Sequence, residues 1–558
     1  MRRPDLLLAL AALAAGVLFF FSVPFLWPLP DADLVADRSE VEAQARAALA
    51  SRGFDVTEWQ TATSVGIDRR VLDYVQRELG VERAQALVRA GFPVVDYDVR
   101  FKKRNETTSY VVSLHPGGGV VRFSRVVEDE FPGASLSAEQ AEVLAREALT
   151  GIGLDMADWS PRSTTEVDRP HRRDHGFTFE RVLIAELGVR ERATVRVAGD
   201  VVDRAQRSVS VPARARKEAK ARAGPGKVLE NIGFLLGAVC ALAAFWVFLT
   251  KLGEGRVRLR RAFALALAIF VGLVVVALLH STRTFQAWDP LFAPAVSLLD
   301  FLVERVTKDL WMTIVLLGVI GAADALDRDL PEAQQRGRTL WSFLSGRFTD
   351  PGVAAASGRG FGIGLLCGGM LAISFWAISL TVGTEVALQP RGVFLDVLNS
   401  SAAPLTALIL FLNAALIEEL GYRWFGATWL HGLTGKRWLA ILIPALVFGL
   451  THTRMFFLPP AEPFWGRAFV MTMVGLVWGW ALFRYDALTV VLSHWVADLV
   501  LFNTPRLFSG KADVIAVTLL TISVPLLPAL LGLARRAMGF GFAPPAAPMA
   551  TGSPPPPG

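Results

Sequence analysis

The sequence predicts a mostly α-helical fold, a polytopic bundle of about 9–10 transmembrane helices with a duplicated, extracytoplasmic α+β region near the N-terminus. Three observations predict this fold. The 558 residues are 53% hydrophobic and 19% charged, with a mean hydropathy of +0.41, which is too apolar for a soluble protein of this size. Uncharged runs long enough to cross a bilayer recur along the chain. A polar stretch, residues 31–227, separates the first run from the others and contains an internal repeat.

The first segment, residues 1–30, is predicted to be an uncleaved membrane anchor. Arg2 and Arg3 precede the uncharged run Leu6–Leu29. This run is longer than the apolar region of a typical signal peptide, and no clear small-x-small cleavage site follows Pro30. A cleavable signal peptide is the alternative interpretation.

Residues 31–227 are predicted to form α+β modules outside the membrane, with repeats at about 39–130 and 137–212. The motif Ala45-Arg-Ala-Ala-Leu49 recurs 100 residues later as Ala145-Arg-Glu-Ala-Leu149. Each copy begins as an amphipathic helix and continues with alternating, strand-like segments. The order of helix and hairpin resembles that of PepSY-type extracytoplasmic modules.

Turn residues at Pro116-Gly-Gly-Gly119 and Ala198-Gly-Asp200 predict one hairpin in each repeat. The stretch Ala213–Lys227 is interpreted as a linker. The three histidines of the region, which form no catalytic pattern, are expected on the solvated surface: His115, His171 and His175. A role in sensing a periplasmic ligand, recruiting a substrate or inhibiting the membrane part is open for this region.

The remaining chain is predicted to lie mostly in the membrane. Transmembrane helices occupy residues 228–395, a core with polar interruptions occupies 396–505, and a last transmembrane helix occupies 506–540. A disordered tail rich in Pro and Gly follows at 541–558. The apolar runs are Ile232–Thr250, Ala262–Leu279, Leu310–Ala323, Phe361–Thr384, Ala402–Ile417, Trp438–Thr451, Ala468–Phe483, Ala487–Phe502 and Val514–Ala534.

The sequence favours a multi-pass protein of a bacterial inner membrane, since high Ala, Arg and Gly with only 5 Tyr is typical of a GC-rich bacterial genome. Net charge is +6, but Lys and Arg occur in short clusters beside apolar runs, so no basic face for nucleic acid is expected. If every run spans the bilayer, the positive-inside rule places both termini in the cytoplasm and residues 31–227 in the periplasm. Cys240 and Cys367 lie within apolar runs and predict neither a disulfide nor a CxxC metal site.

Ionisable residues inside predicted membrane helices mark the candidate site, because each costs about 2.5–3.5 kcal/mol on insertion scales. Glu419 and Arg423 are four residues apart and can form a pair on one helix face. Glu418 is rotated by about 100° from Glu419, so its carboxylate is expected to point elsewhere and to remain available for chemistry.

Two further helices contribute histidines. His452 ends an apolar run, and His494 and Asp498 are spaced to lie on one face of another. Taken singly, each is compatible with a structural role. Together with Glu418, they can converge on one point and hold a divalent metal or a polarised water.

At these residues the chain resembles the CPBP family, which includes CAAX prenyl endopeptidases and Abi-type proteins linked to bacteriocin self-protection. The family motifs EExxxR, FxxxH and HxxxN or HxxxD occur here in order on successive apolar helices. They read Glu418-Glu419-x-x-x-Arg423, Phe448-x-x-x-His452 and His494-x-x-x-Asp498. The resemblance covers residues 400–505, and Asp498 stands where Asn is common.

The resemblance implies an intramembrane metalloendopeptidase that cleaves a membrane-anchored protein or peptide. Glu418 would be the general base, His452 would share proton transfer or metal binding, and His494 and Asp498 would position the water or metal and stabilise the oxyanion. Glu419 and Arg423 would support the site structurally. The implied cofactor is a divalent metal such as Zn, with His452, His494, Asp498 and Glu418 as donors.

Two non-proteolytic alternatives remain open. One is a non-enzymatic immunity or binding protein that keeps the polar residues as a structural cluster. The other is a transporter, because carboxylates and histidines in membrane helices also suit proton relays, although the inverted repeats typical of transporters are not visible in the sequence. Ser493 lies next to His494, but nothing resembles the GxSxG motif of a nucleophilic serine.

Overall fold

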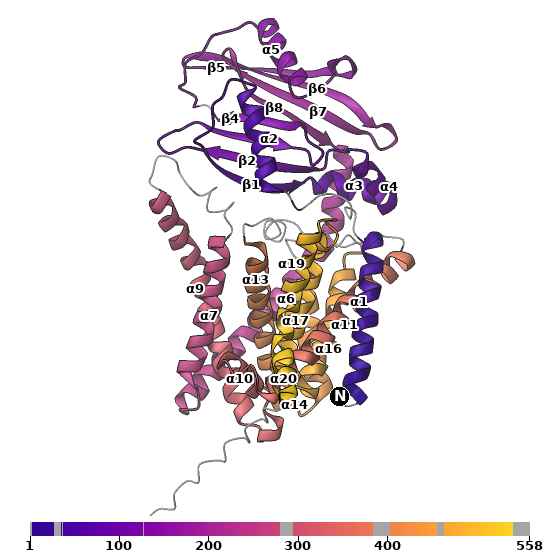
Figure 1. The fold of residues 1–558 in the computed structure, drawn as a ribbon, viewed down its shortest axis with the longest axis vertical. Helices are drawn as coiled ribbons and strands as arrows, with labels where there is room; N and C mark the ends of the chain where they lie inside the picture. Colours follow the sequence, from indigo (N-terminus) through magenta and orange to yellow (C-terminus); the bar gives the residue numbers. More distant parts are fainter. Residues whose placement is uncertain are drawn as a thin grey trace, which may run out of the picture.

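The computed structural model describes residues 3–26, 35, 37–126, 128–279, 294–382, 402–454 and 463–538. The predicted tail at 541–558 and parts of several predicted segments lie outside the described residues. The described chain forms two parts, a β-sheet domain and a bundle of apolar helices, with the sheet domain at one end of the bundle (Figure 1).

The sheet domain contains one antiparallel sheet of eight strands in the order β1-β2-β3-β4-β8-β7-β6-β5. Its strands are β1 (Gln60–Ile67), β2 (Val95–Lys102), β3 (Ser109–Leu114), β4 (Val120–Val126), β5 (Ser160–Arg169), β6 (Arg172–Ile184), β7 (Val189–Ala198) and β8 (Val201–Ser210). Its helices are α2 (Arg38–Ala50), α3 (Arg69–Leu79), α4 (Val81–Arg89) and α5 (Ala138–Thr150), with short 3-10 turns η1 (Met156–Asp158) and η2 (Ala185–Leu187).

The predicted repeat is visible as two matching halves of this sheet. Asp37 caps α2 and Ser137 caps α5, and both helices bury the same three positions, which are Val41, Ala45 and Leu49 in α2 and Ala141, Ala145 and Leu149 in α5. Both predicted hairpins are confirmed as β3–β4 and β7–β8. The halves join where β4 pairs with β8, so the two repeats share one continuous sheet.

Three expectations for this region are wrong or incomplete. His175 is buried, with its Nε2 3.0 Å from the Leu136 carbonyl oxygen, because its strand position faces the helix-covered side of the sheet. The predicted linker Ala213–Lys227 is the first part of the continuous helix α6 (Ala213–Gly253), which the Ala, Lys and Arg of this stretch favour. The outer strands β1 and β5 were not predicted from the sequence, and every β5 residue except the last is exposed.

The helix bundle agrees with the predicted polytopic fold. Among the described residues, eight helices are long and apolar enough to span a membrane, and α15 and α17 are shorter apolar helices. Besides α6, the bundle elements are α1 (Arg3–Leu26), α7 (Leu259–Leu279), α9 (Pro294–Arg328), η3 (Glu332–Gln334), α10 (Arg338–Leu344), α11 (Pro351–Val382), α13 (Ala403–Glu418), η4 (Glu419–Ala427), α14 (Thr428–Thr434), α15 (Arg437–Thr451), α16 (Gly466–Arg484), α17 (Ala487–Phe502), α18 (Thr504–Leu507), α19 (Ala512–Ser523), η5 (Val524–Leu526) and α20 (Leu527–Ala537).

Glycines on α11 allow close packing on two sides. A Cβ at Gly364 would lie 2.6 Å from the Ser493 carbonyl oxygen of α17, and one at Gly369 would lie 2.5 Å from the Ala15 carbonyl oxygen of α1. Small residues at helix contacts are typical of membrane bundles, where backbones approach closely. Helix α1 therefore packs along α11 as part of the bundle, and α11 in turn packs against α17.

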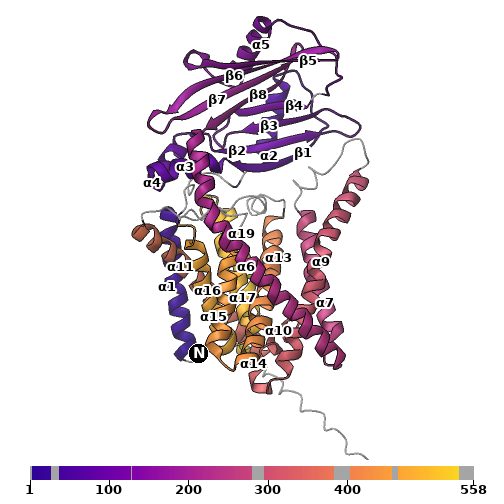
Figure 2. The same ribbon diagram turned by 180° about the vertical axis from the view of Figure 1, so that it is seen from behind.

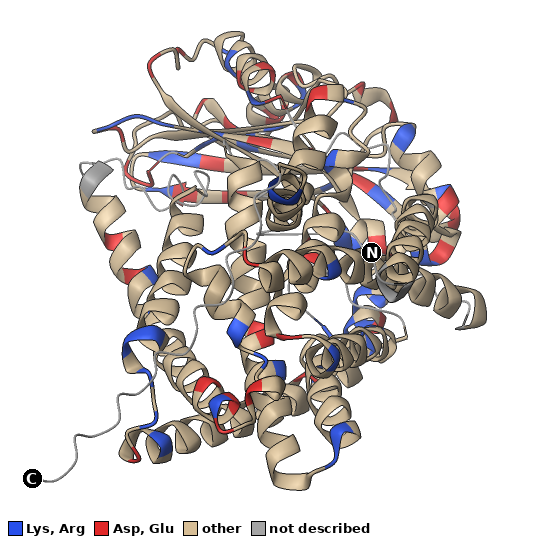
Figure 3. Ribbon diagram, turned by 60° about the horizontal axis from the view of Figure 1, so that its bottom comes forward, with Lys and Arg blue, Asp and Glu red and all other residues tan. Residues whose placement is uncertain are grey.

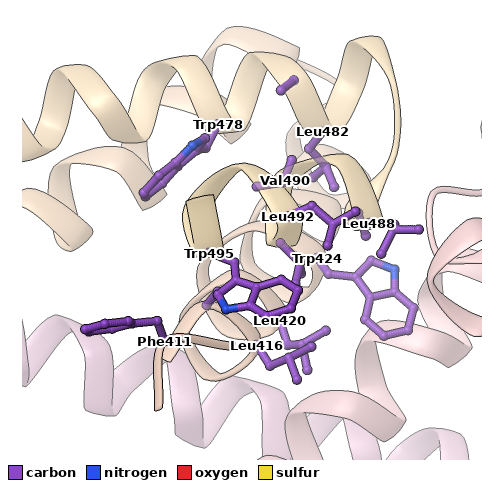
Figure 4. Packing of buried hydrophobic residues seen from close by; sticks show 14 of the residues in the cluster. Phe411, Leu416, Leu420, Trp424, Trp478, Leu482, Leu488, Val490, Leu492 and Trp495 are labelled. Carbon is purple, nitrogen blue, oxygen red and sulfur yellow. The ribbon is translucent and has the colours of Figure 1, made fainter. Parts of the chain in front are cut away.

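Helix α17 runs through the middle of the bundle (Figures 1 and 2). The side chains around it include Trp478 of α16, Trp495 of α17 itself and Leu416 of α13 (Figure 4). All α17 residues are buried except Ala497, Asp498 and Leu501. A helix that is apolar on nearly every side belongs in the core of a bundle, so a charged residue on it calls for a local explanation.

Charged residues occur mainly in the sheet domain and around the ends of the helices (Figure 3). Lys and Arg occur in the last turns of α6, α9, α16 and α20 and in the turns that follow α6 and α14. All of these lie at the end of the bundle that carries the N-terminus, away from the sheet domain (Figure 1). This arrangement is the one that the sequence analysis required for a positive-inside topology.

Candidate active site

The first part of the site lies where an α-helix becomes a π-helix. Glu418 is the last residue of α13, and Glu419 is the first of η4, a π-helical segment that continues into α14. Short π-helical segments within α-helices occur frequently at functional sites. The sequence motif gave no indication of this local geometry.

Glu419 is paired and buried, as its spacing from Arg423 predicts. The Arg423 Nη1 atom lies 3.1 Å from Glu419 Oε1, and both side chains are only 1% exposed. The same carboxylate oxygen lies 2.8 Å from His494 Nδ1. Because a carboxylate can only accept hydrogen bonds, this contact assigns the Nδ1 proton to His494 and turns its Nε2 away from Glu419.

His452 is held in a similar way at the end of α15. Its Nδ1 lies 2.7 Å from the Phe448 carbonyl oxygen, and its ring packs on the Phe448 ring with centroids 4.1 Å apart. The carbonyl can only accept, so Nδ1 carries the proton and the Nε2 lone pair is available to the site. The FxxxH spacing thus places one turn of helix between the histidine and the backbone group that orients it.

The two Nε2 atoms face Glu418. Glu418 Oε2 lies 3.6 Å from His452 Nε2 and 3.8 Å from His494 Nε2. Asp498 Oδ2 lies 3.4 Å from His494 Nε2. The structure therefore brings together the four residues predicted to be catalytic, from three different helices, and the separations leave Glu418 Oε2 without a hydrogen-bond partner among the described residues.

These four side chains line a cavity of about 90 Å³ inside the bundle, enough for a few water molecules. The three α17 residues that are not fully buried, Ala497, Asp498 and Leu501, all line it. Its other walls are largely apolar and come from α11, α13, α16 and α17. The charged residue on α17, Asp498, is thus explained because its side chain lines the cavity and does not pack in the apolar core.

The sequence analysis missed the aromatic residue that packs on His494. Trp478 of α16 stacks on the His494 ring with centroids 4.2 Å apart and an interplanar angle of 20°. The Trp478 indole N–H donates to Ser493 Oγ at 2.8 Å. Arg423 lies over the same Trp478 ring at 5.2 Å and over Phe448 at 4.2 Å. A Trp in an apolar helix gives no sequence indication of such a role, and α16 also contains Trp480.

The donor chemistry of the site suits a divalent metal, since imidazole nitrogens and carboxylate oxygens are common ligands of Zn. Among the described residues, however, no group of three or more His, Cys, Asp or Glu side chains is placed to hold a metal ion in this arrangement. Binding of a metal would therefore require the side chains around the cavity to move closer together.

The fold and the site define a multi-pass helical membrane protein with a buried cluster of carboxylates and histidines around a small cavity. Residues 400–500 match the family described as Rce1-like, Type II CAAX prenyl endopeptidase Rce1-like. This match covers the three motifs and agrees with the resemblance seen in the sequence. It supports intramembrane protease activity in general and a membrane protein substrate. Comparison with curated proteins and with solved structures gives no match.

Proposed function

We propose that the protein is an intramembrane endopeptidase in which Glu418 activates a water molecule held between Glu418 and His452. The proposal rests on the different surroundings of two adjacent carboxylates. Glu419 is neutralised by Arg423 and oriented toward His494, whereas Glu418 faces the cavity and two imidazole Nε2 atoms without a direct partner.

In the proposed reaction a water between Glu418 and His452 attacks the scissile carbonyl carbon and gives its proton to Glu418. His452 Nε2 accepts a hydrogen bond from the water and fixes its direction. His494 Nε2, supported by Asp498, donates a hydrogen bond to the oxyanion that forms. The C–N bond then breaks as Glu418 returns the proton to the leaving nitrogen, which yields a carboxylic acid and an amine.

We also propose that the site can bind the divalent metal that the family resemblance implies. His452, His494 and Asp498, with Glu418, would hold it, and when bound it would polarise the substrate carbonyl and the water. Metal analysis of the purified protein, with His452→Ala as the comparison, tests this without an activity assay. A stoichiometric metal that is lost in the variant supports the site, and equal metal content in both proteins contradicts it.

Proteolysis is tested by comparing the newly formed protein N-termini in membranes that contain wild-type protein or Glu418→Gln at matched levels. General acid–base catalysis contributes about 10²–10⁴-fold, so termini that depend on Glu418 should disappear in the variant. Glu304→Gln is the matched control, because Glu304 is an exposed carboxylate on α9 that pairs with Lys308 far from the cavity. Identical profiles for wild type and Glu418→Gln would contradict the proposal and favour a binding or immunity role.

We also propose the topology, with both termini in the cytoplasm of a bacterium and the sheet domain in the periplasm. The Lys and Arg residues at the end of the bundle opposite the sheet domain support this topology. Labelling of single cysteines by a membrane-impermeant reagent tests it. A cysteine at Arg104, on the exposed β2–β3 turn, should react in intact spheroplasts, and one at Arg347 should react only after lysis.

A further inference from the structure

The inference concerns the face of the sheet that α2 and α5 leave uncovered, which is seen from the front in Figure 2. Alternate residues of each strand face the two sides of a sheet. Phe123 and Ala205 belong to the hydrophobic clusters under the helices, so their neighbours Arg122 and Arg204 point to the uncovered face. By the same alternation Arg100, between Val99 and Phe101, points there too.

Arg122 and Arg204 lie at the junction of the two repeats. Arg122 pairs with Gln206 and Ser124 pairs with Arg204 in the β4–β8 register. The two arginines are therefore diagonal neighbours and occupy equivalent positions in the two repeats. Arg100 lies in the same row as Ser124 and Arg204, two strands away from β4.

The positive charge at this junction is only partly compensated. Arg196 of β7 stands directly opposite Arg204, an arrangement that destabilises a sheet when both residues are charged. Asp203 pairs with Arg196, with Nε and Oδ1 2.8 Å apart, and Asp96 interacts with Arg122 at longer range. Asp98 stands in the same row as Arg122, with Ser113 between them, and accepts a hydrogen bond from the Ser113 hydroxyl. Burial, and then repulsion from Arg196 and Arg122, lowers the pKa of Arg204.

The buried Nε atoms of Arg100, Arg122 and Arg204 have no hydrogen-bond partner among the described residues. Arginine is the side chain best suited to bind phosphate and carboxylate groups through paired N–H donors. Residues placed against the rules of sheet stability are expected where a function requires them.

We propose that the uncovered face at the β4–β8 junction binds a small, soluble oxyanion ligand that carries a phosphate or several carboxylates. Arg100, Arg122 and Arg204 hold the anionic group, and the ligand relieves the repulsion between Arg204 and Arg196. Proteolysis at the membrane site is not required for this proposal.

Two features favour a soluble small molecule over a lipid headgroup or an acidic polypeptide. The strand nearest the helix bundle is β1, and three strand spacings of about 4.8 Å separate it from β4, so the junction lies roughly 14 Å further from the bundle than the sheet edge. Arg122 and Arg204 also lie on adjacent strands, and Arg100 lies two strand spacings from β4, about 10 Å, which is within the reach of one small ligand with more than one anionic group. An extended acidic chain would need a longer row of cations.

The strand that carries Arg204 leads directly into a helix that contacts the membrane site. Strand β8 carries Arg204 and ends at Ser210, and α6 begins at Ala213. Helix α6 then runs into the bundle, where Gly233 packs against the backbone of Leu450 and Thr451, directly before His452. Helix α6 therefore connects the strand that carries Arg204 to the helix that ends at His452.

The experiment measures hydrogen exchange in the full-length, detergent-solubilised protein while inorganic phosphate, and separately citrate, is titrated. Sodium chloride at equal ionic strength is the control for screening. We expect saturable protection of peptides covering β4 and β8, with half-saturation shifted roughly tenfold or more by Arg122→Gln or Arg204→Gln. Arg104→Gln removes the same charge from an exposed turn and should leave the titration unchanged.

Without ligand, Arg204→Gln should be as stable as wild type or more stable, because it removes the repulsion with Arg196. That result separates loss of binding from loss of folding. Protection that sodium chloride reproduces, or a titration that Arg204→Gln leaves intact, overturns the proposal. Saturation by poly-glutamate or by anionic lipid vesicles, with no response to phosphate or citrate, also overturns it and assigns the face to a peptide or a membrane.

Discussion

Adjacent glutamates should respond to the same substitution in opposite ways. Glu418→Ala removes a carboxylate whose side chain is 26% exposed to the cavity and whose nearest nitrogen partners are 3.6 and 3.8 Å away. We expect this change to abolish proteolysis while altering the free energy of unfolding by less than about 1 kcal/mol, because no close hydrogen bond or ion pair is broken. Glu419→Ala should behave differently.

The Glu419 carboxylate lies 3.1 Å from Arg423 Nη1 and 2.8 Å from His494 Nδ1. The Arg423 side chain is only 1% exposed, so this ion pair is buried. Removing one member of a buried ion pair leaves the other charge uncompensated and typically costs about 3–5 kcal/mol. Glu419→Ala should therefore lower the thermal unfolding temperature strongly, and it should also reduce activity because His494 loses the group that orients it.

The assay is thermal unfolding of both variants in the same detergent, followed by tryptophan fluorescence, with activity measured well below the lower transition. A double variant, Glu419→Leu with Arg423→Leu, is the control. It should recover part of the lost stability, since no buried charge is left without a partner. Equal destabilisation by Glu418→Ala and Glu419→Ala would refute the division of roles between the two carboxylates.

Three further predictions follow from single contacts. Trp478→Leu should lower kcat about tenfold with little change in KM, because the ring stacked on His494 is lost, and Trp478→Phe should lower it less; a change confined to KM would contradict a positioning role. Gly233→Val should reduce activity about tenfold or more, since a Cβ there would lie 2.5 Å from the backbone of α15, whereas Gly237→Val, with open space around it, should be harmless in the same assay. Burial and neighbouring carboxylates raise the pKa of Asp96 to about 6, above its unfolded value, so the sheet domain loses stability as pH rises through this range. The substitution Asp96→Asn should therefore raise the unfolding temperature at pH 7 and have no effect near pH 4, and a stabilisation that is equal at both pH values would show that ionisation is not the cause.

Local sequence spacing was sufficient for several parts of the site. The four-residue spacings of Glu419 with Arg423 and of His494 with Asp498 predicted pairs that the structure contains, because one helical turn fixes which side chains are neighbours. The apolar runs likewise predicted the bundle, and the repeated Ala45 and Ala145 motifs predicted two matching helices. Each of these features depends on residues close together in the chain.

Contacts between distant segments were decided only by the tertiary structure. Three features depend on which strand or helix lies alongside another. They are the joining of the repeats through β4 and β8, the burial of His175, and the stacking of Trp478 on His494. Sequence periodicity describes the faces of one element and does not specify its partner. The continuous helix α6 was also decided by the tertiary structure. Its first, polar part was interpreted as a linker, and only the structure shows that this part continues into the segment whose Gly233 packs on α15.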